Sequence, residues 1–345
     1  MFTSFVNDTA DDLWLSALDR FREGSANKQS SRAGLTDELL HAALCLRDPR
    51  QRWVISRFPA LNPAFALAEV IWMLRGRNDS AFLTYFNSEL TRFAGNGTEF
   101  HGAYGHRLRQ SMNIDQLARG YHVLRAKPDS RQVVFQIWEA LSDMPSQEGI
   151  EAAEDIPCNV CAMLKVREGR LEWTQIMRSN DLYRGLPYNI VQFTTLHEVM
   201  AGWLGLELGH YNHLSDSLHL YENTAEEVFE SAKVESVMNT DSLAASYEET
   251  ELITLDLERI VVKIIDKSIN GEIIMAEFTN LKIPNAWMNI AAILVAEGMR
   301  KRKDWGGMQV VLNQCGNQIL RVLYERWLAR LVHKVTNPST AVQKA

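Results

Sequence analysis

The middle of this chain restricts its fold more than any other part. Two runs of alternating or β-branched residues, 158–166 and 171–178, flank Glu168-Gly169 and predict two strands joined by a turn. Residues 188–204 follow as an almost wholly apolar run that ends near Gly205, which predicts a buried helix. The 345 residues give room for one large domain or two smaller ones. We therefore expect an α+β core.

The composition changes after Tyr221, and three parts are expected along the chain. Residues 1–222 carry the mixed helix and strand patterns of the core. Residues 223–251 are acidic and have little apolar periodicity, so we interpret them as a solvated linker or excursion. Residues 252–345 are expected to complete or extend the core.

The third part is predicted to hold a hairpin followed by helices. Asn270-Gly271 lies between two apolar runs, a pattern typical of a hairpin turn. Residues 285–300 and 307–333 have amphipathic helical spacing. The second of these helices carries a row of basic residues, more typical of a solvated face than of a nucleic-acid surface: Arg321, Arg326, Arg330 and Lys334.

Charge and composition exclude several classes of protein. Lys and Arg number 36 against 43 Asp and Glu, so the net charge is −7 and a general nucleic-acid binder is not expected. The N-terminus lacks a basic start and a sustained apolar stretch, and no run approaches the length of a membrane span. Four cysteines are too few for a disulfide scaffold at this length. We therefore expect a cytoplasmic protein with reduced thiols and no membrane partner.

Cys158 is the first candidate for chemistry. It follows a proline in the sequence DIPCNVC, and a thiolate is a strong nucleophile when nearby positive charge lowers its pKa. The alternative is a small buried hydrophobic residue. Cys158 and Cys161 have a spacing also found in redox and zinc sites, but residues three apart in a strand face opposite sides. We expect no shared site and no metal.

Two further groups of polar residues remain open between a site and a structural role. The run RSND at 178–181 combines guanidinium, hydroxyl, amide and carboxylate groups, which suit either a phosphate site or a polar loop. Glu69 lies on an otherwise apolar helical face, so it either lines a pocket or has a structural partner. A histidine-rich stretch contains His210, His213 and His219. A metal site is the lesser alternative there, because the stretch lacks the HExxH pattern of zinc enzymes.

Taken in order, these motifs resemble the thymidylate synthase family over roughly residues 11–222. The motifs that carry the resemblance are LAEVIWMLRG (67–76), AYGHRLR (103–109), PDSRQ (128–132), IPCNVC (156–161), QIMRSNDLYRGLPYNI (175–190) and SDSLHLY (215–221). The family implies a three-layer α+β core and a homodimer. It also implies one-carbon transfer from 5,10-methylenetetrahydrofolate to C5 of a pyrimidine nucleotide such as dUMP.

The resemblance assigns roles residue by residue. Cys158 is implied as the nucleophile that adds to C6 of the base. Proton movement is implied for Glu69 and Tyr104, and orientation of folate or base for Asp181. Phosphate binding is implied for four residues, with Arg131 reaching across the dimer: Arg32, Arg131, Arg178 and Ser179. The ribose hydroxyl is implied to meet His219 and Tyr221.

Asn189 indicates which base is bound. An amide can both donate and accept, which matches the N3–H and O4 groups of uracil. Family members that act on cytosine nucleotides have aspartate at this position. Asn189 therefore favours dUMP over dCMP.

Departures from the family pattern indicate the product. Gln132 replaces a phosphate arginine, Asn159 replaces the histidine after the nucleophile, and residues 80–93 lack the expected tryptophan. The chain ends in polar NPSTAVQKA where the family has an apolar tail that closes over folate. A site more open to water favours addition of water to the transferred carbon, and so a deoxyuridylate hydroxymethyltransferase. The alternatives are a divergent thymidylate synthase and a non-catalytic binding or regulatory family member.

Overall fold

A mixed β-sheet forms the centre of the fold. The computed structural model describes residues 2–31, 34–235 and 237–336. Its eight-stranded sheet has the strand order β1-β3-β8-β6-β5-β4, with β2 paired to β3 and β7 paired to β8. The strands are β1 (Thr3–Asn7), β2 (Asn27–Ser31), β3 (Gly34–Leu46), β4 (Val134–Gln136), β5 (Asn159–Arg167), β6 (Arg170–Met177), β7 (Asn180–Asp181) and β8 (Glu207–Tyr221).

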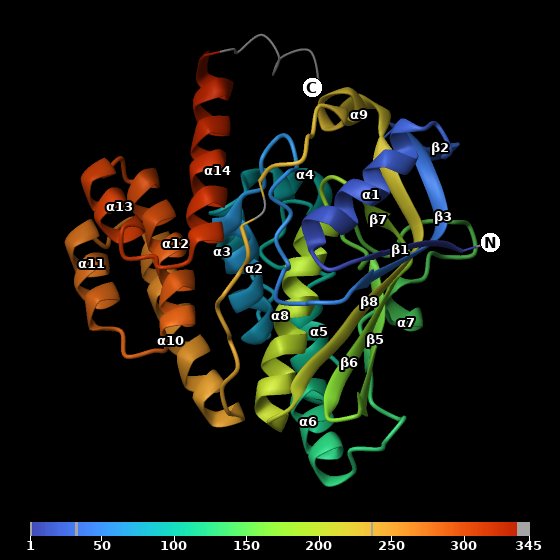
Figure 1. Ribbon diagram of the computed structural model, residues 1–345, viewed down its shortest axis with the longest axis horizontal. Coiled ribbons are helices and arrows are strands. Elements are labelled where there is room, and N and C mark those ends of the chain that lie inside the picture. Colours follow the sequence, from blue (N-terminus) through green and yellow to red (C-terminus); the bar gives the residue numbers. More distant parts are fainter. Residues whose placement is uncertain (1, 32–33, 236, 337–345) are drawn as a thin grey trace.

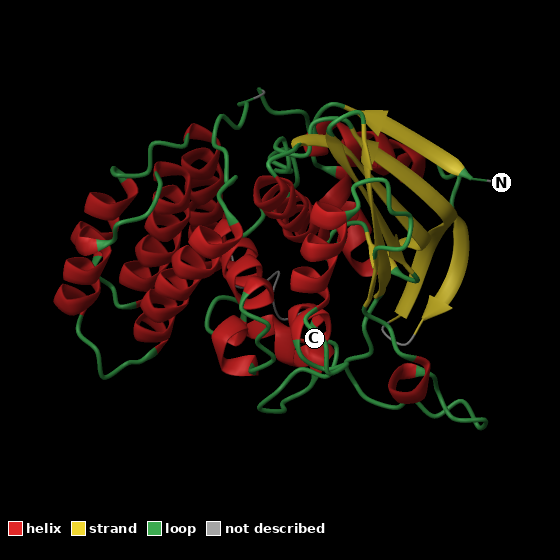
Figure 2. Ribbon diagram, turned by 90° about the horizontal axis from the view of Figure 1, so that it is seen from below, coloured by secondary structure: helices red, strands yellow, loops and turns green. Residues whose placement is uncertain are grey.

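Helices gather mainly on one side of this sheet (Figures 1 and 2). Those up to residue 229 are α1 (Ala10–Arg22), α2 (Pro63–Leu74), α3 (Ser80–Thr84), the 3₁₀ helix η1 (Ser88–Leu90), α4 (Thr91–Ala94), α5 (Tyr104–Arg109), α6 (Gln116–Ala126), α7 (Ala140–Asp143), α8 (Leu186–Leu204) and α9 (Glu222–Phe229). The C-terminal helical region then contains α10 (Tyr247–Ile265), α11 (Gly271–Asn280), α12 (Asn285–Lys301), α13 (Trp305–Leu312) and α14 (Gln318–Thr336).

The predicted strands and buried helix in the middle of the chain are confirmed. β5 and β6 pair antiparallel, and Glu168 and Gly169 make the turn with positive φ angles of 50° and 75°. α8 is buried along most of its length and ends at Gly205, whose φ of 65° is the left-handed conformation that favours glycine at a helix end. The α+β prediction is therefore confirmed.

The C-terminal helical region shares its core with the rest of the chain. α2 begins at Pro63 and is capped by Asn62, whose side chain accepts a hydrogen bond from the Phe65 backbone N–H at 3.1 Å. Nearly every α2 side chain is buried, because α8 packs on it from the sheet side and α10, α12 and α14 pack on it from the other side. Packing around α2 therefore joins the two parts.

The acidic segment 223–251 is not the solvated linker that its composition suggests. Val228 in α9 is fully buried, and the backbone N–H of Val234 donates to the Ser56 hydroxyl at 2.8 Å. Further along, the Asp241 carboxylate accepts hydrogen bonds from the side-chain amides of Asn289 and Asn317, at 2.8 and 2.7 Å. Hydrogen bonds from its own backbone and side chains therefore hold this segment against both parts of the protein.

The hairpin expected at Asn270-Gly271 is wrong. Asn270 is the N-cap of α11, where its side chain accepts from the backbone N–H of Ile273 at 2.9 Å. The preceding apolar run belongs to α10, whose buried residues Ile253, Leu257 and Ile264 follow a helical period. An Asn-Gly pair can begin a helix as well as turn a hairpin.

The helix predicted over 307–333 is two helices. α13 ends at Leu312 and α14 begins at Gln318, with Cys315 buried between them. The basic row on α14 is not simply a solvated face, because the Arg330 guanidinium donates to the Ala60 carbonyl at 2.6 Å. The side chain of Lys334 lies outside the described residues. Among the described residues, every helix is too short or too polar to cross a membrane.

Candidate functional site

Cys158 and Arg178 meet where β5 begins and β6 ends. The backbone N–H of Arg178 donates to the Cys158 carbonyl at 2.9 Å. The Arg178 guanidinium donates to the carbonyl oxygens of Pro157 and Ile156 at 3.0 and 3.2 Å. Cys158 is half-buried and free of any disulfide, while Arg178 is exposed. A cation therefore lies against the backbone that leads into a half-buried thiol, a setting suited to nucleophilic chemistry.

Asn189, in the first turn of α8, is held by two neighbouring amides. Its Nδ2 donates to Asn180 Oδ1 at 3.2 Å, and its Oδ1 lies 3.5 Å from Asn159 Nδ2. The tight turn before it requires glycine, because an added Cβ at Gly185 would lie 2.7 Å from Asn180 Oδ1. One N–H and one lone pair of the Asn189 amide remain for a ligand.

The histidine-rich stretch takes part in a buried hydrogen-bonded network through His213. Asn180 Nδ2 donates to His213 Nε2 at 3.0 Å, and Tyr211 Oη lies 2.9 Å from His213 Nδ1. Because Nε2 accepts, Nδ1 carries the proton and the ring is neutral. Burial lowers the pKa of His213 to about 3. Within the described ranges, His, Cys, Asp and Glu side chains form no cluster of three suited to a metal ion.

Glu69 and Tyr104 are brought together by the crossing of α2 and α5. An added Cβ at Gly105 would lie 2.4 Å from the Met73 Cα atom, so the helices approach too closely for a side chain there. Met73 lies one helical turn beyond Glu69. Burial raises the pKa of Glu69 to about 8, and the Gln192 amide opposes this rise. Glu69 Oε2 is buried without a hydrogen-bond partner among the described residues.

The Tyr104 hydroxyl lies in the same environment as the thiol. Burial, followed by the nearby Cys158, raises the pKa of Tyr104, while a hydrogen bond with Asn159 lowers it. Asp155 and Glu69 add smaller upward contributions to the same pKa. Tyr104 thus stays a neutral hydroxyl that can relay a proton between the carboxyl and the nucleophile side of the site.

His219 and Tyr221 share a face at the end of β8. Their rings meet edge to face with centroids 5.3 Å apart. β7 pairs alongside, with Asp181 opposite His219. The Asp181 carboxylate accepts from the backbone N–H groups of Tyr183 and Arg184, at 2.7 and 2.9 Å. Asp181 therefore shapes the turn into α8.

Three predicted phosphate residues lie in different settings. Ser179 is half-buried between Arg178 and β7. Arg131 is exposed ahead of β4, so it is free to meet another chain. Arg32 lies outside the described residues.

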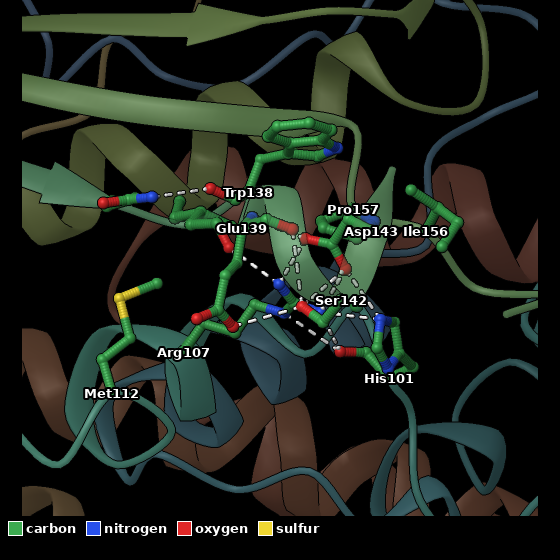
Figure 3. Close-up of polar contacts among 12 residues, drawn as sticks. His101, Arg107, Met112, Trp138, Glu139, Ser142, Asp143, Ile156 and Pro157 are labelled. Carbon is green, nitrogen blue, oxygen red and sulfur yellow. Dashed lines mark hydrogen bonds and ion pairs between the residues drawn. The ribbon is translucent and has the colours of Figure 1, made fainter. Parts of the chain in front are cut away.

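A buried ion pair supports the backbone near Cys158 and was not predicted. Arg107 on α5 donates to both carboxylate oxygens of Asp143, at 2.6 and 2.8 Å, and His101 Nε2 lies 2.7 Å from the same carboxylate. Figure 3 draws this cluster together with Ile156 and Pro157. Arg107 also donates to the Ile137 carbonyl at 2.9 Å, and Ile137 N–H donates to Val160 in β5 at 2.9 Å. The ion pair thereby anchors the start of β5.

Comparison with known proteins identifies the family. Residues 47–271 match the family model described as thymidylate synthase. The chain belongs to the thymidylate synthase family. This match begins after the first strands and runs through α10, so the family's sequence pattern extends beyond residue 222. The boundaries of the three parts predicted from composition stay predictions.

Thymidylate synthase family members of two kinds are similar to this chain. A deoxyuridylate hydroxymethyltransferase of Bacillus phage SP01 is 37% identical over 51% of this chain and 48% of its own length. A protein of the same name from Pseudomonas phage M6 is 38% identical over 48% of this chain and 47% of its own length. The chain thus spans about half the length of these two relatives. A thymidylate synthase of Listeria monocytogenes is 30% identical over 52% of this chain and 59% of its own length.

Two polar residues of the site were missed from the sequence, Gln175 and Gln192. Gln175 donates to Asn159 Oδ1 at 2.9 Å and to the Cys161 carbonyl at 3.2 Å. Gln192 lies one helical turn beyond Asn189 and faces Glu69. A polar residue in an apolar strand or helix was the available signal for both, as it was for Glu69.

Proposed function

We propose that this protein transfers a one-carbon unit from 5,10-methylenetetrahydrofolate to C5 of dUMP and releases 5-hydroxymethyl-dUMP. The observation that carries the proposal is the meeting of Cys158 and Arg178 beside the amide network of Asn189. The two phage relatives described above are named deoxyuridylate hydroxymethyltransferases, which favours this product.

Cys158 acts first in the proposed reaction. Its sulfur bonds to C6 of the uracil, and C5 gains the electron density needed to attack the one-carbon unit. Arg178 is assigned to favour the thiolate, since its guanidinium lies against the carbonyls of Pro157 and Ile156, just before Cys158. The nucleotide phosphate is assigned to Arg178, Ser179 and Arg32, and to the partner subunit's Arg131.

Asn189 selects the base and Glu69 handles protons. The amide of Asn189 pairs with N3–H and O4 of uracil, and Asn159 and Asn180 fix its orientation. Glu69 is protonated near neutral pH because burial raises its pKa to about 8, so it can donate toward O4 as negative charge develops on the ring. Tyr104 exchanges a proton with C5, and His219 and Tyr221 hold the ribose.

Water completes the proposed reaction. After tetrahydrofolate leaves, water adds to the methylene on C5, and cleavage of the S–C6 bond releases the hydroxymethyl nucleotide. dUMP, methylenetetrahydrofolate and water are consumed, and 5-hydroxymethyl-dUMP and tetrahydrofolate are formed. The one-carbon unit keeps its oxidation state, so no reductant is needed.

A homodimer is part of the proposal. Side chains of cross-strand partners line the face of the sheet that lies opposite the main helical layer. Many side chains on this face are apolar and incompletely buried. They are Val6, Cys45, Val134, Cys161, Met163, Ile176 and Leu214. A second copy of the chain covering this face would bury them.

Product analysis tests the proposal. Incubation with dUMP and methylenetetrahydrofolate should yield a nucleotide with the mass of 5-hydroxymethyl-dUMP and no stoichiometric dihydrofolate. The second candidate is a thymidylate synthase, favoured by the similarity to the Listeria enzyme. Formation of dTMP with an equal amount of dihydrofolate would establish that reaction instead. If the pure protein forms neither product, the result would favour a non-catalytic family member.

A further inference from the structure

A chain of side-chain hydrogen bonds runs through the interior of the protein and includes Asn189. Its members come from four strands of the sheet and from α8, and each is no more than 7% exposed. In order along the chain of hydrogen bonds they are Trp173, Gln175, Asn159, Asn189, Asn180 and His213.

Gln175, near the start of this chain, can take only one orientation. The Trp173 indole N–H, which can only donate, donates to Gln175 Oε1 at 3.1 Å. The Cys161 carbonyl, which can only accept, accepts from Gln175 Nε2 at 3.2 Å. A Gln175 amide turned the other way would lose both hydrogen bonds. Its Nε2 therefore faces Asn159 Oδ1, to which it donates at 2.9 Å.

The orientation of Gln175 determines that of the next three amides. Asn159 uses its oxygen to accept from Gln175, so its Nδ2 faces Asn189 Oδ1, at 3.5 Å. Asn189 in turn directs its Nδ2 towards Asn180 Oδ1, at 3.2 Å. Each amide thus accepts through oxygen from the residue before it and donates through nitrogen to the residue after it.

The far end of the chain is a neutral imidazole. Asn180 Nδ2 donates to His213 Nε2 at 3.0 Å and to the Ser215 hydroxyl oxygen at 3.1 Å. Both amide hydrogens of Asn180 are thereby used, and its oxygen is left for Asn189. Because the ring is neutral, His213 Nε2 has a lone pair that accepts from Asn180.

The orientation of the Asn189 amide decides which base it can match. With its oxygen at N3–H and its nitrogen at O4, the amide matches uracil. An amide turned by half a turn has almost the same shape and matches cytosine, which has an acceptor at N3 and an amino group at C4. In that reversed orientation, the Asn189 nitrogen would face Asn159 Nδ2 and its oxygen would face Asn180 Oδ1. Donor would then oppose donor and acceptor would oppose acceptor.

We propose that Gln175, Asn180 and His213 are positioning residues that determine base specificity by fixing the orientation of the Asn189 amide. This inference rests on the proposed function, in which Asn189 contacts the base. The preference for uracil then depends on a chain of hydrogen bonds that starts at Trp173 in β6 and ends at His213 in β8.

Titration calorimetry of the full chain with dUMP and with dCMP tests the role of Gln175. The wild type should bind dUMP at least about tenfold more tightly than dCMP. Gln175→Leu, of similar size, should lower this ratio by about tenfold, and part of the change should be tighter binding of dCMP. A purely structural defect would not tighten dCMP binding. Thr194→Val is the control for a buried polar residue, because its hydroxyl donates to the Ile190 carbonyl of its own helix.

Two substitutions at Asn180 test the chain independently, should Gln175→Leu fail to fold. Asn180→Ala removes the acceptor for Asn189 Nδ2 and should lower the ratio by about tenfold. Asn180→Asp keeps an oxygen that can accept from Asn189, so it should keep the preference for dUMP. Circular dichroism establishes that each variant is folded.

Several outcomes would overturn the proposal. Equal weakening of dUMP and dCMP in Gln175→Leu and Asn180→Ala would indicate a structural role alone. A wild-type preference for dUMP that persists unchanged in both variants would refute the positioning role and leave the proposed function intact. Loss of the preference in Asn180→Asp as in Asn180→Ala would show that the acceptor at this position is not what orients Asn189. A wild type that binds neither nucleotide would refute the proposed function itself.

Discussion

The backbone N–H of Arg178 donates to the carbonyl oxygen of Cys158 at 2.9 Å, so the arginine and the proposed nucleophile are fixed to each other by the pairing of β5 and β6. The guanidinium in turn holds the two residues before the cysteine, through the carbonyls of Pro157 and Ile156. Arg178 therefore has two proposed roles. It shapes the backbone that presents the thiol, and it supplies charge to the thiolate and to a phosphate.

Glu69→Gln should change how stability depends on pH. The pKa of Glu69 is about 8 in the folded chain and near its ordinary value when unfolded. The folded state therefore holds a proton that the unfolded state loses, and the wild type should lose stability as pH rises from about 5 to about 8. The loss should be on the order of a few kcal/mol and absent in the variant. Urea denaturation at several pH values measures it, with exposed Glu226→Gln as control. Parallel curves for wild type and Glu69→Gln would contradict the assignment.

Asn189→Asp should change base preference. An ionised aspartate accepts from the cytosine amino group and cannot donate to O4 of uracil. We expect the ratio of kcat/KM for dUMP to that for dCMP to fall by about 10². Asn189→Ala should weaken the binding of both nucleotides. The comparison separates a change in base selection from a simple loss of contacts. An unchanged ratio in the aspartate variant would show that another residue reads the base.

Asp143→Asn should destabilise the fold by about 3–5 kcal/mol, because it leaves the Arg107 guanidinium buried with a neutral partner. Burial tends to raise the pKa of Asp143, but hydrogen bonds from Arg107 and the Glu139 backbone outweigh it and lower the pKa. The carboxylate thus contributes stability above about pH 4 that is lost as pH falls. Urea denaturation of this variant, with exposed Asp129→Asn as control, measures the loss. Equal midpoints for the two variants would be inconsistent with a supporting ion pair.

Local patterns predicted those strands and helices whose buried side chains recur along the sequence with the period of the element itself. The alternation around Glu168-Gly169 and the apolar run ending at Gly205 gave β5, β6 and α8 within two residues. Asn270-Gly271 failed because the same pair can cap a helix, and only the helical spacing of Ile253, Leu257 and Ile264 decides between the two. Helical period should outweigh a turn signal when the run is long.

The motifs of the candidate site could be predicted from the sequence, but the residues that support those motifs could not. Cys158, Arg178 and Asn189 lie in recognisable motifs, and the structure brings them near one another. Asp143 and Arg107 gave no signal, since an isolated aspartate and arginine look the same whether exposed or paired in the interior. The packing of α14 against the core was equally hidden, because Arg330 and Ala60 are 270 positions apart and leave no local pattern.

Covalent trapping tests the central claim most directly. The protein is incubated with 5-fluoro-dUMP and methylenetetrahydrofolate, digested, and the modified peptide is sequenced by mass spectrometry. Fluorine at C5 replaces the hydrogen that would leave as a proton, so the reaction should stop at a stable adduct on Cys158. Cys158→Ser should form no adduct. Cys161→Ala should still be modified at Cys158. An adduct on Cys161, or an active enzyme that forms no adduct, would contradict the account.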